Sequence, residues 1–242
     1  MDSSTGQTNT LLVFSKNILV NQLKIAAPTI EKSFDSLCDP DVQELSEFLS
    51  ETLALLLSGH RAASNRNREL HRICAELLMN AGNSFCAALT LLRTGYVLQP
   101  GIVLRSLMES VSTMLHLVQF PKDIVAYKND ALKSPKTISS AKKLLPPFGG
   151  LYGFYSENFT HISRLHRSVE PVRAYESRDE GLELNLAFFR MSAWLLYVAT
   201  ELLFGELLEE TRYWKFRDDV VTSWAPSAQE RDWMSSFFRI PD

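Results

Sequence analysis

The sequence predicts an all-α protein, an up-down helical bundle of about five long helices with short helices in a crossover. Apolar residues recur at helical spacing in several long segments, as between Leu98 and Val118. Strand signals are nearly absent, since the chain has no alternating runs of Val, Ile and Thr and no Asn-Gly or Asp-Gly hairpin turn. We therefore expect a single helical domain over residues 1–242.

Capping residues set the expected bounds of the first two helices. Asp39-Pro40 supplies an N-cap followed by proline at the first helical position, which predicts a helix from there to about Leu57. Ser64-Asn65 precedes a second periodic segment, which runs to about Arg93 and ends at Thr94-Gly95. This second helix has a continuous apolar side, so it is expected to pack on the core.

Proline and two capping boxes mark the later helices. Pro100 helps to start a third helix. A serine followed three residues later by glutamate forms a capping box at Ser177 and again at Ser227. The first box predicts a long helix from Leu182 to about Thr211, and the second predicts a short C-terminal helix.

Residues 120–150 are expected to form an irregular crossover, because prolines and glycines divide them into short pieces. Six lysines stand in this segment against two aspartates. Solvated surface lysines are the favoured interpretation, and contact with phosphate is the alternative. A further helix is expected from Leu151 to Arg167.

Composition narrows the class of protein. Hydrophobic residues make up 45% and charged residues 22%, as in soluble globular proteins. The net charge of -3 disfavours general attraction to nucleic acid or to anionic membranes, while local patches stay open. Cys38, Cys74 and Cys86 form no CxxC pair, which favours buried thiols in a reducing compartment. The apolar stretch from Leu182 to Leu208 contains charged residues, so we expect a core helix, no membrane span and a cytoplasmic protein.

One face of the third helix carries a polar line. Arg105, Glu109, Ser112 and His116 follow one another at intervals of four, three and four residues, along one side of the helix. Such a line is either the solvated side of the helix or a polar seam inside the bundle. Arg105 and Glu109 can form an ion pair across one turn, and a structural role is its favoured interpretation.

A second polar line lies on the helix predicted from Leu151 to Arg167. A carboxylate at Glu157, one turn before His161, would raise the pKa of the imidazole and could orient its ring for acid–base chemistry. A surface or capping role is the alternative. We expect this line to meet Arg105 and Glu109 in the core, in a closed polar network or small pocket. The candidate catalytic residues are His161, Glu157, Arg105 and Glu109.

The start of the second helix offers a third candidate. Arg66, Asn67 and His71 resemble the R-x(4–6)-H signature of HEPN domains, helical bundles of which many are metal-independent ribonucleases. The resemblance implies that His71 moves the 2′-OH proton while Arg66 holds the scissile phosphate. A solvated basic helix start is the alternative. Arginine near a helix N-terminus opposes the macrodipole, so something else should favour it there. The acidic residues Glu206, Glu209 and Glu210 are expected to form a solvated face.

Three stretches resemble an uncharacterised, mostly bacterial all-helical family. They are Phe85 to Gly95, with its LLRTG ending, Leu104 to Ser110, which reads LRSLMES, and Tyr152 to His161. The resemblance spans Leu70 to His166 and implies an all-α bundle, with a distant kinship to HEPN-like bundles and no assigned activity. It also implies a set of side chains that face one another: Arg105, Glu109, Ser156, Glu157 and His161. The chain departs from the HEPN pattern because no arginine stands four to six residues before His161.

The sequence thus predicts a helical bundle that binds a protein partner or a small ligand beside a buried polar network. A HEPN-like metal-independent ribonuclease or a nucleotide-binding protein is the alternative, so enzymatic activity is left open. RNA and a second copy of the chain stay open as partners. No metal or cofactor is predicted, because metalloprotease, P-loop, hydrolase-elbow and dinucleotide-binding motifs are missing.

Overall fold

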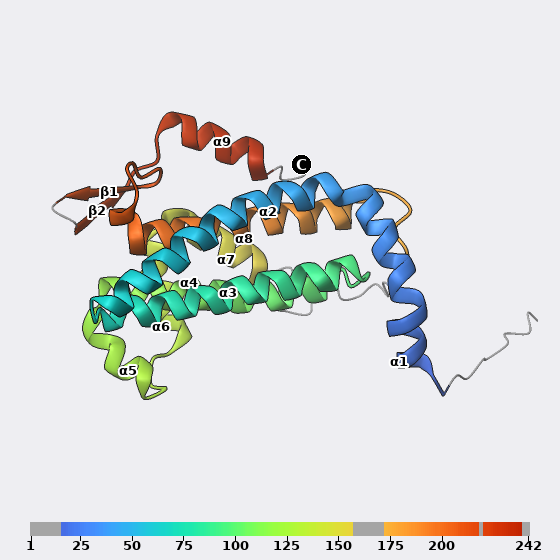
Figure 1. Ribbon diagram of the computed structural model, residues 1–242, viewed down its shortest axis with the longest axis horizontal. Helices are drawn as coiled ribbons and strands as arrows, with labels where there is room; N and C mark the ends of the chain where they lie inside the picture. The colour runs from blue at the N-terminus through green and yellow to red at the C-terminus, as the bar shows by residue number, and fades with distance from the viewer. Residues whose placement is uncertain (1–15, 157–171, 218–219, 239–242) are drawn as a thin grey trace, which may run out of the picture.

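The computed structural model describes residues 16–156, 172–217 and 220–238, which fold mainly as α-helices (Figure 1). The long helices are α2 (Ala27–Asn65), α3 (Glu69–Arg93), α4 (Gln99–Gln119) and α8 (Glu180–Phe204). The shorter elements are α1 (Ile18–Asn21), a π-helical turn (Gln22–Ala26), α5 (Ile124–Lys128), α6 (Ser134–Leu144), α7 (Pro146–Tyr155), β1 (Trp214–Arg217), β2 (Val220–Trp224) and α9 (Ala228–Phe238). The predicted all-α bundle is confirmed.

The helix α8 is the centre of the bundle. Every residue from 185 to 204 is buried, so the helix is surrounded on all sides by other elements. It is long and apolar enough to cross a membrane, but the apolar window is entirely enclosed within the fold. Its N-cap is Asp179, whose Oδ1 accepts the Leu182 N–H at 2.8 Å. The predicted N-cap at Ser177 is therefore wrong, whereas Ser227 does cap α9 through the Glu230 N–H.

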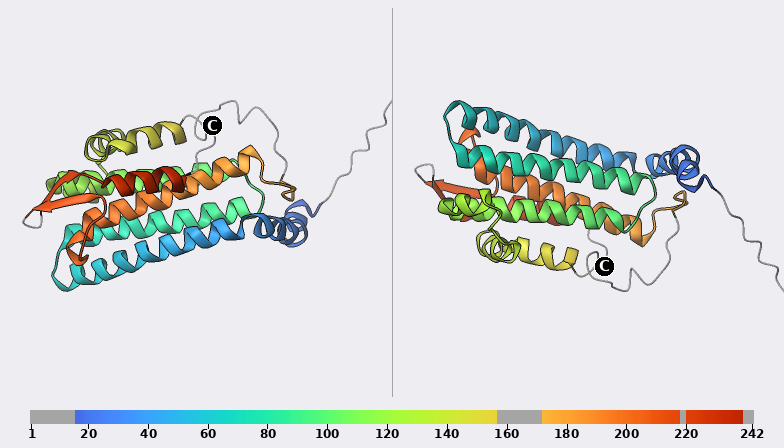
Figure 2. Two further views of the ribbon diagram at one scale, coloured as in Figure 1. Left: turned by 90° about the horizontal axis from the view of Figure 1, so that it is seen from above. Right: turned by 90° about the horizontal axis from the view of Figure 1, so that it is seen from below.

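Three helices run in one direction and α3 runs in the other. Figure 1 shows α2, α4 and α8 starting at the same end of the bundle, while α3 starts at the opposite end. The crossover returns the chain between α4 and α8. Its helices α6 and α7 lie on the outer side of α4, where α6 crosses α4 steeply and α7 runs alongside it (Figure 2). The helix predicted to start at Leu151 begins earlier, as α7 at Pro146, and its predicted part beyond residue 156 lies outside the described residues.

The expected start of the first long helix at Asp39-Pro40 is wrong, because α2 begins at Ala27 and continues through Pro40. Proline inside a helix removes a backbone hydrogen bond and costs about 3 kcal/mol. Ile30, Phe34 and Cys38 offset this cost, since they are buried at helical spacing on the N-terminal side of the proline.

The helix expected to reach Thr211 ends at Phe204, and an antiparallel hairpin that the sequence did not predict follows. The buried carboxylate of Glu201 holds the start of this hairpin. It accepts the backbone N–H groups of Arg212, Tyr213 and Trp214 at 3.1, 2.8 and 3.0 Å. Burial raises the pKa of Glu201 above its usual range, and these three hydrogen bonds partly oppose that rise. The hairpin therefore depends on a contact with α8 and less on its own sequence.

A buried ion-pair network joins α2 to α8. The Arg190 side chain is fully buried and pairs with Asp41, which is 3% exposed, and with Glu44 at 3.1 Å. Arg178 donates to the second oxygen of Asp41 at 2.5 Å. Burial alone would raise the pKa of Asp41, but hydrogen bonds from the two arginines outweigh it and lower the pKa. The carboxylate therefore stabilises the fold above its unfolded-state pKa, and this contribution is lost as pH falls through its folded-state pKa.

Removing the Asp41 carboxylate should destabilise the fold more than removing an exposed ion pair. In Asp41→Ala, Arg190 stays buried without this partner, and losing one member of a buried pair costs about 3–5 kcal/mol of unfolding free energy. Glu51→Ala breaks an exposed pair with Arg212 and should cost less than about 1 kcal/mol. Urea unfolding measures both variants. Equal losses would show that the buried pair has no larger role than the exposed one.

Candidate functional site

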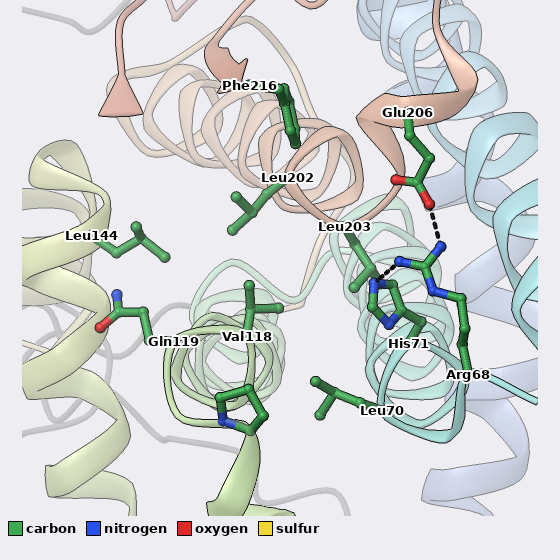
Figure 3. A pocket seen from close by; sticks show the side chains of 11 residues that line it. Arg68, Leu70, His71, Val118, Gln119, Leu144, Leu202, Leu203, Glu206 and Phe216 are labelled. Carbon is green, nitrogen blue, oxygen red and sulfur yellow. Dashed lines mark hydrogen bonds and ion pairs between the residues drawn. The ribbon is translucent and has the colours of Figure 1, made fainter. Parts of the chain in front are cut away.

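A cavity of about 340 Å³ opens at the end of the bundle where α2 turns into α3 (Figure 3). Helices α3, α4, α6 and α8 and strand β1 all contribute to its wall. Most of this wall is apolar and is formed by Leu70, Val118, Leu144, Leu202, Leu203 and Phe216. The cavity therefore offers a ligand a mainly apolar environment.

One edge of the cavity is polar. The Arg68 guanidinium donates hydrogen bonds to the Glu206 carboxylate and to Nε2 of His71, and Figure 3 shows Arg68 between these two side chains. Because a guanidinium can only donate, Nε2 of His71 is the acceptor and the ring proton lies on Nδ1. The imidazole is therefore held in one neutral tautomer.

The electrostatics of this edge favour an uncharged histidine. Burial lowers the pKa of His71 below its usual value, and the nearby Arg68 charge lowers it further, while Glu206 opposes both. The ring is therefore neutral at pH 7. The charges of Arg68 and Glu206 offset each other, so the polar edge carries no net charge although it contains three titratable groups.

The local sequence explains how these side chains meet. Asn67 adopts a positive φ of 52° in the tight turn between the two helices, a conformation that asparagine tolerates better than most residues. Arg68 is the N-cap residue of α3, so His71 follows almost one turn later. The Glu206 carboxylate offsets the cost of an arginine at this helix N-terminus, and it does not simply form part of a solvated face.

The close approach of α2 and α8 brings Glu206 to this place. A Cβ atom at Gly59 of α2 would overlap the Phe204 ring at the end of α8, so only glycine fits there. The Phe204 ring in turn lies 6.2 Å from the His71 ring, measured between centroids. Glycine at this crossing therefore positions the end of α8 against the start of α3.

The residues predicted by the HEPN resemblance are only partly brought together. His71 lines the cavity, and its arginine partner is Arg68. Arg66 is exposed at the end of α2, and Asn67 lines a separate shallow pocket with Ser64 and Arg72. Neither Arg66 nor Asn67 is among the residues that line the cavity.

The first two residues of the polar line on α4, Arg105 and Glu109, form an ion pair near the surface. Arg105 Nε donates to Glu109 Oε1 at 3.1 Å, and its Nη2 lies 3.4 Å from the Tyr152 hydroxyl of α7. The two charged side chains are 29% and 38% exposed. The pair is therefore only half-buried, and its expected position in the core is wrong. Glu157 and His161 lie outside the described residues.

The other two residues of this line, Ser112 and His116, form a buried polar seam between α4 and α6. Ser112 lies 3.1 Å from the Thr137 hydroxyl. His116 is 1% exposed, with Nδ1 at 2.7 Å from Ser140 Oγ and Nε2 at 2.8 Å from the Asp123 carboxylate. Since the carboxylate accepts, Nε2 of His116 carries a proton. The crossover thus supplies partners that the pattern on α4 could not identify.

Ser140, His116 and Asp123 have the connectivity of a nucleophilic triad, but their surroundings exclude that role. Ser140 is 8% exposed, and none of the three residues lines the cavity. Ser140 Oγ also lies 2.9 Å from the Thr137 carbonyl of its own helix. The seam instead supports the wall of the cavity, since Gln119, which lines it, approaches the Ser140 carbonyl at 3.4 Å.

Other reactive groups lie apart from the cavity. Burial raises the pKa of the Cys38 thiol to about 11 and that of Cys74 to about 12, so neither is a thiolate at neutral pH. Over the ranges that the structure describes, no three His, Cys, Asp or Glu side chains are grouped to hold a metal ion.

Substitutions in the seam should change stability in a graded way. His116→Ala removes a buried ring and two hydrogen bonds, and should lower the unfolding free energy by about 2–4 kcal/mol. Ser140→Ala should cost about 1 kcal/mol. Lys136→Gln, which removes an exposed charge beside Asp123, should cost less than about 1 kcal/mol. Chemical denaturation measures all three, and a neutral His116→Ala would contradict the structural role.

No family model matches the chain, and neither a curated protein nor a solved structure does. The two family resemblances in the sequence therefore stay predictions. The geometry of the cavity and its polar edge is the basis for inferring a function.

Proposed function

We propose that the protein binds a small, mainly apolar molecule in the cavity beside His71, through one uncharged hydrogen-bonding group. The observation that carries this proposal is the position of His71, hydrogen-bonded to Arg68, at the edge of an apolar cavity. Specific sites for small molecules commonly combine apolar walls with a few fixed polar groups. The volume of about 340 Å³ lies within the usual range of such sites.

The polar edge favours a hydroxyl or an amide over a charged group. An anionic ligand would have to compete with Glu206 for Arg68, and a cationic ligand would have to compete with Arg68 for Glu206. A neutral polar group can bond to the imidazole while Arg68 and Glu206 stay paired. The apolar body of the ligand would then contact Leu203 and Val118, with about 25 cal/mol gained per Å² of apolar surface removed from water.

Three probes of similar size test this chemistry: phenol, toluene and benzoate. We expect phenol to bind most tightly, since a neutral hydrogen bond is worth about 0.5–1.5 kcal/mol, or roughly three- to tenfold over toluene. Benzoate should bind most weakly. In His71→Leu the difference between phenol and toluene should disappear. Ligand-observed NMR titration measures each affinity.

A matched pair of substitutions locates the bound probe. Val118→Phe fills the cavity and should weaken phenol binding at least about tenfold. Val125→Phe makes the same change at an exposed position and should leave binding unchanged. Equal affinity in the two variants would place the phenol elsewhere. Tighter binding of benzoate than of phenol would contradict a neutral site and point to Arg68 as the binding group.

Metal-independent ribonuclease activity is the second candidate, and one observation favours it. A neutral imidazole at His71 can accept a 2′-OH proton at Nε2 once the Arg68 guanidinium turns from that atom to a phosphate, which it would stabilise. This candidate predicts cleavage of a mixed single-stranded and hairpin RNA pool in EDTA. Cleavage should be lost in His71→Ala at an unchanged melting temperature. Absence of cleavage by the unsubstituted protein would rule this candidate out.

A further inference from the structure

An apolar helical segment stands clear of the bundle at the start of the described chain. Figure 1 shows α1 directed away from the other helices, at the end of the bundle opposite the turn from α2 to α3. None of residues 18–26, which form α1 and the π-helical turn, is buried. The segment therefore contributes no side chain to the described core.

This segment, residues 18–26, concentrates the exposed apolar surface of the described chain. Ile18, Leu19, Leu23 and Ile25 are 66–74% exposed, and Val20 is 50% exposed. These five are nearly half of the eleven large hydrophobic side chains that are exposed in the described residues, and the others are distributed over several elements. Single exposed apolar residues are ordinary, whereas such a cluster indicates a binding surface.

The charge around the segment is positive. Lys24 is its one charged residue, Lys16 lies two residues before it, and the sequence has no acidic residue between Asp2 and Glu31. The whole chain, in contrast, carries a net charge of -3. Apolar and cationic side chains thus occur together in this one place, a combination that suits an anionic partner with an apolar interior.

We propose that residues 18–26 bind to an anionic lipid surface, with the apolar side chains inserted below the headgroups and Lys16 and Lys24 beside the phosphates. A second copy of the chain fits this segment less well. Nine helical residues are only about 13 Å long, and a stable protein interface needs about 800 Å² from each partner. A lipid surface has no such requirement and accepts apolar side chains over a broad arc of a helix.

Vesicle co-sedimentation of the full chain tests the proposal. The protein should sediment with phosphatidylcholine vesicles that contain about 30% phosphatidylserine, and more weakly with pure phosphatidylcholine. Lys16→Gln/Lys24→Gln should lower the affinity for the anionic vesicles at least about tenfold and abolish its salt dependence. Leu19→Gln/Leu23→Gln should lower the affinity for both kinds of vesicle.

A control variant distinguishes vesicle binding by residues 18–26 from nonspecific binding by other exposed apolar side chains. Ile102→Gln/Val125→Gln removes two apolar side chains that are exposed elsewhere and should leave vesicle binding unchanged. Because all these positions are exposed, each variant should keep the melting temperature of the unsubstituted protein. Failure of the unsubstituted protein to sediment, or sedimentation unaffected by Leu19→Gln/Leu23→Gln, would overturn the proposal. A concentration-dependent dimer that is lost in Leu19→Gln/Leu23→Gln would assign the segment to a second copy instead.

Discussion

The buried pair of Arg190 and Asp41 is the constraint on which the arrangement of the bundle depends. It places two charges between α2 and the enclosed helix α8, where a shift of either helix would leave a charge without its partner. At the other end of the same two helices, Gly59 and Phe204 allow only one close approach. Together these contacts fix the position of α8 along α2. Glu206, which follows the end of α8, is thereby placed beside Arg68 at the cavity.

The walls of the cavity are held in two different ways. Leu202 and Leu203 belong to α8, and dense apolar packing holds that helix in the core. The opposite wall comes from α6 and the end of α4, where polar side chains such as His116 and Ser140 make the contact. Hydrogen bonds of this kind depend more strongly on geometry than apolar packing does. The α6 wall is therefore the part of the cavity whose position is most sensitive to single substitutions.

Sequence patterns correctly predicted the features that depend on residues close together in the chain. The helical period predicted the bundle and the core helix, and the four-residue spacing predicted the pair of Arg105 and Glu109. Contacts between distant segments could not be predicted in this way. The sequence identified His71 as a candidate, but its partner Arg68 depends on the Asn67 turn, and Arg68 meets Glu206 across 138 residues. The hairpin after α8 likewise depends on the buried Glu201.

The enclosed position of α8 also affects how the chain can fold. This helix is synthesised after α2, α3 and α4, although it supplies the surface on which their apolar sides pack. Asp41 cannot form its buried ion pair until Arg190, 149 residues later in the chain, has been synthesised. Closing so long a loop is entropically costly and slow. The first three long helices can pack on one another, but they leave the ribosome with the apolar surface that contacts α8 uncovered, and in this interval the nascent chain is most exposed to aggregation.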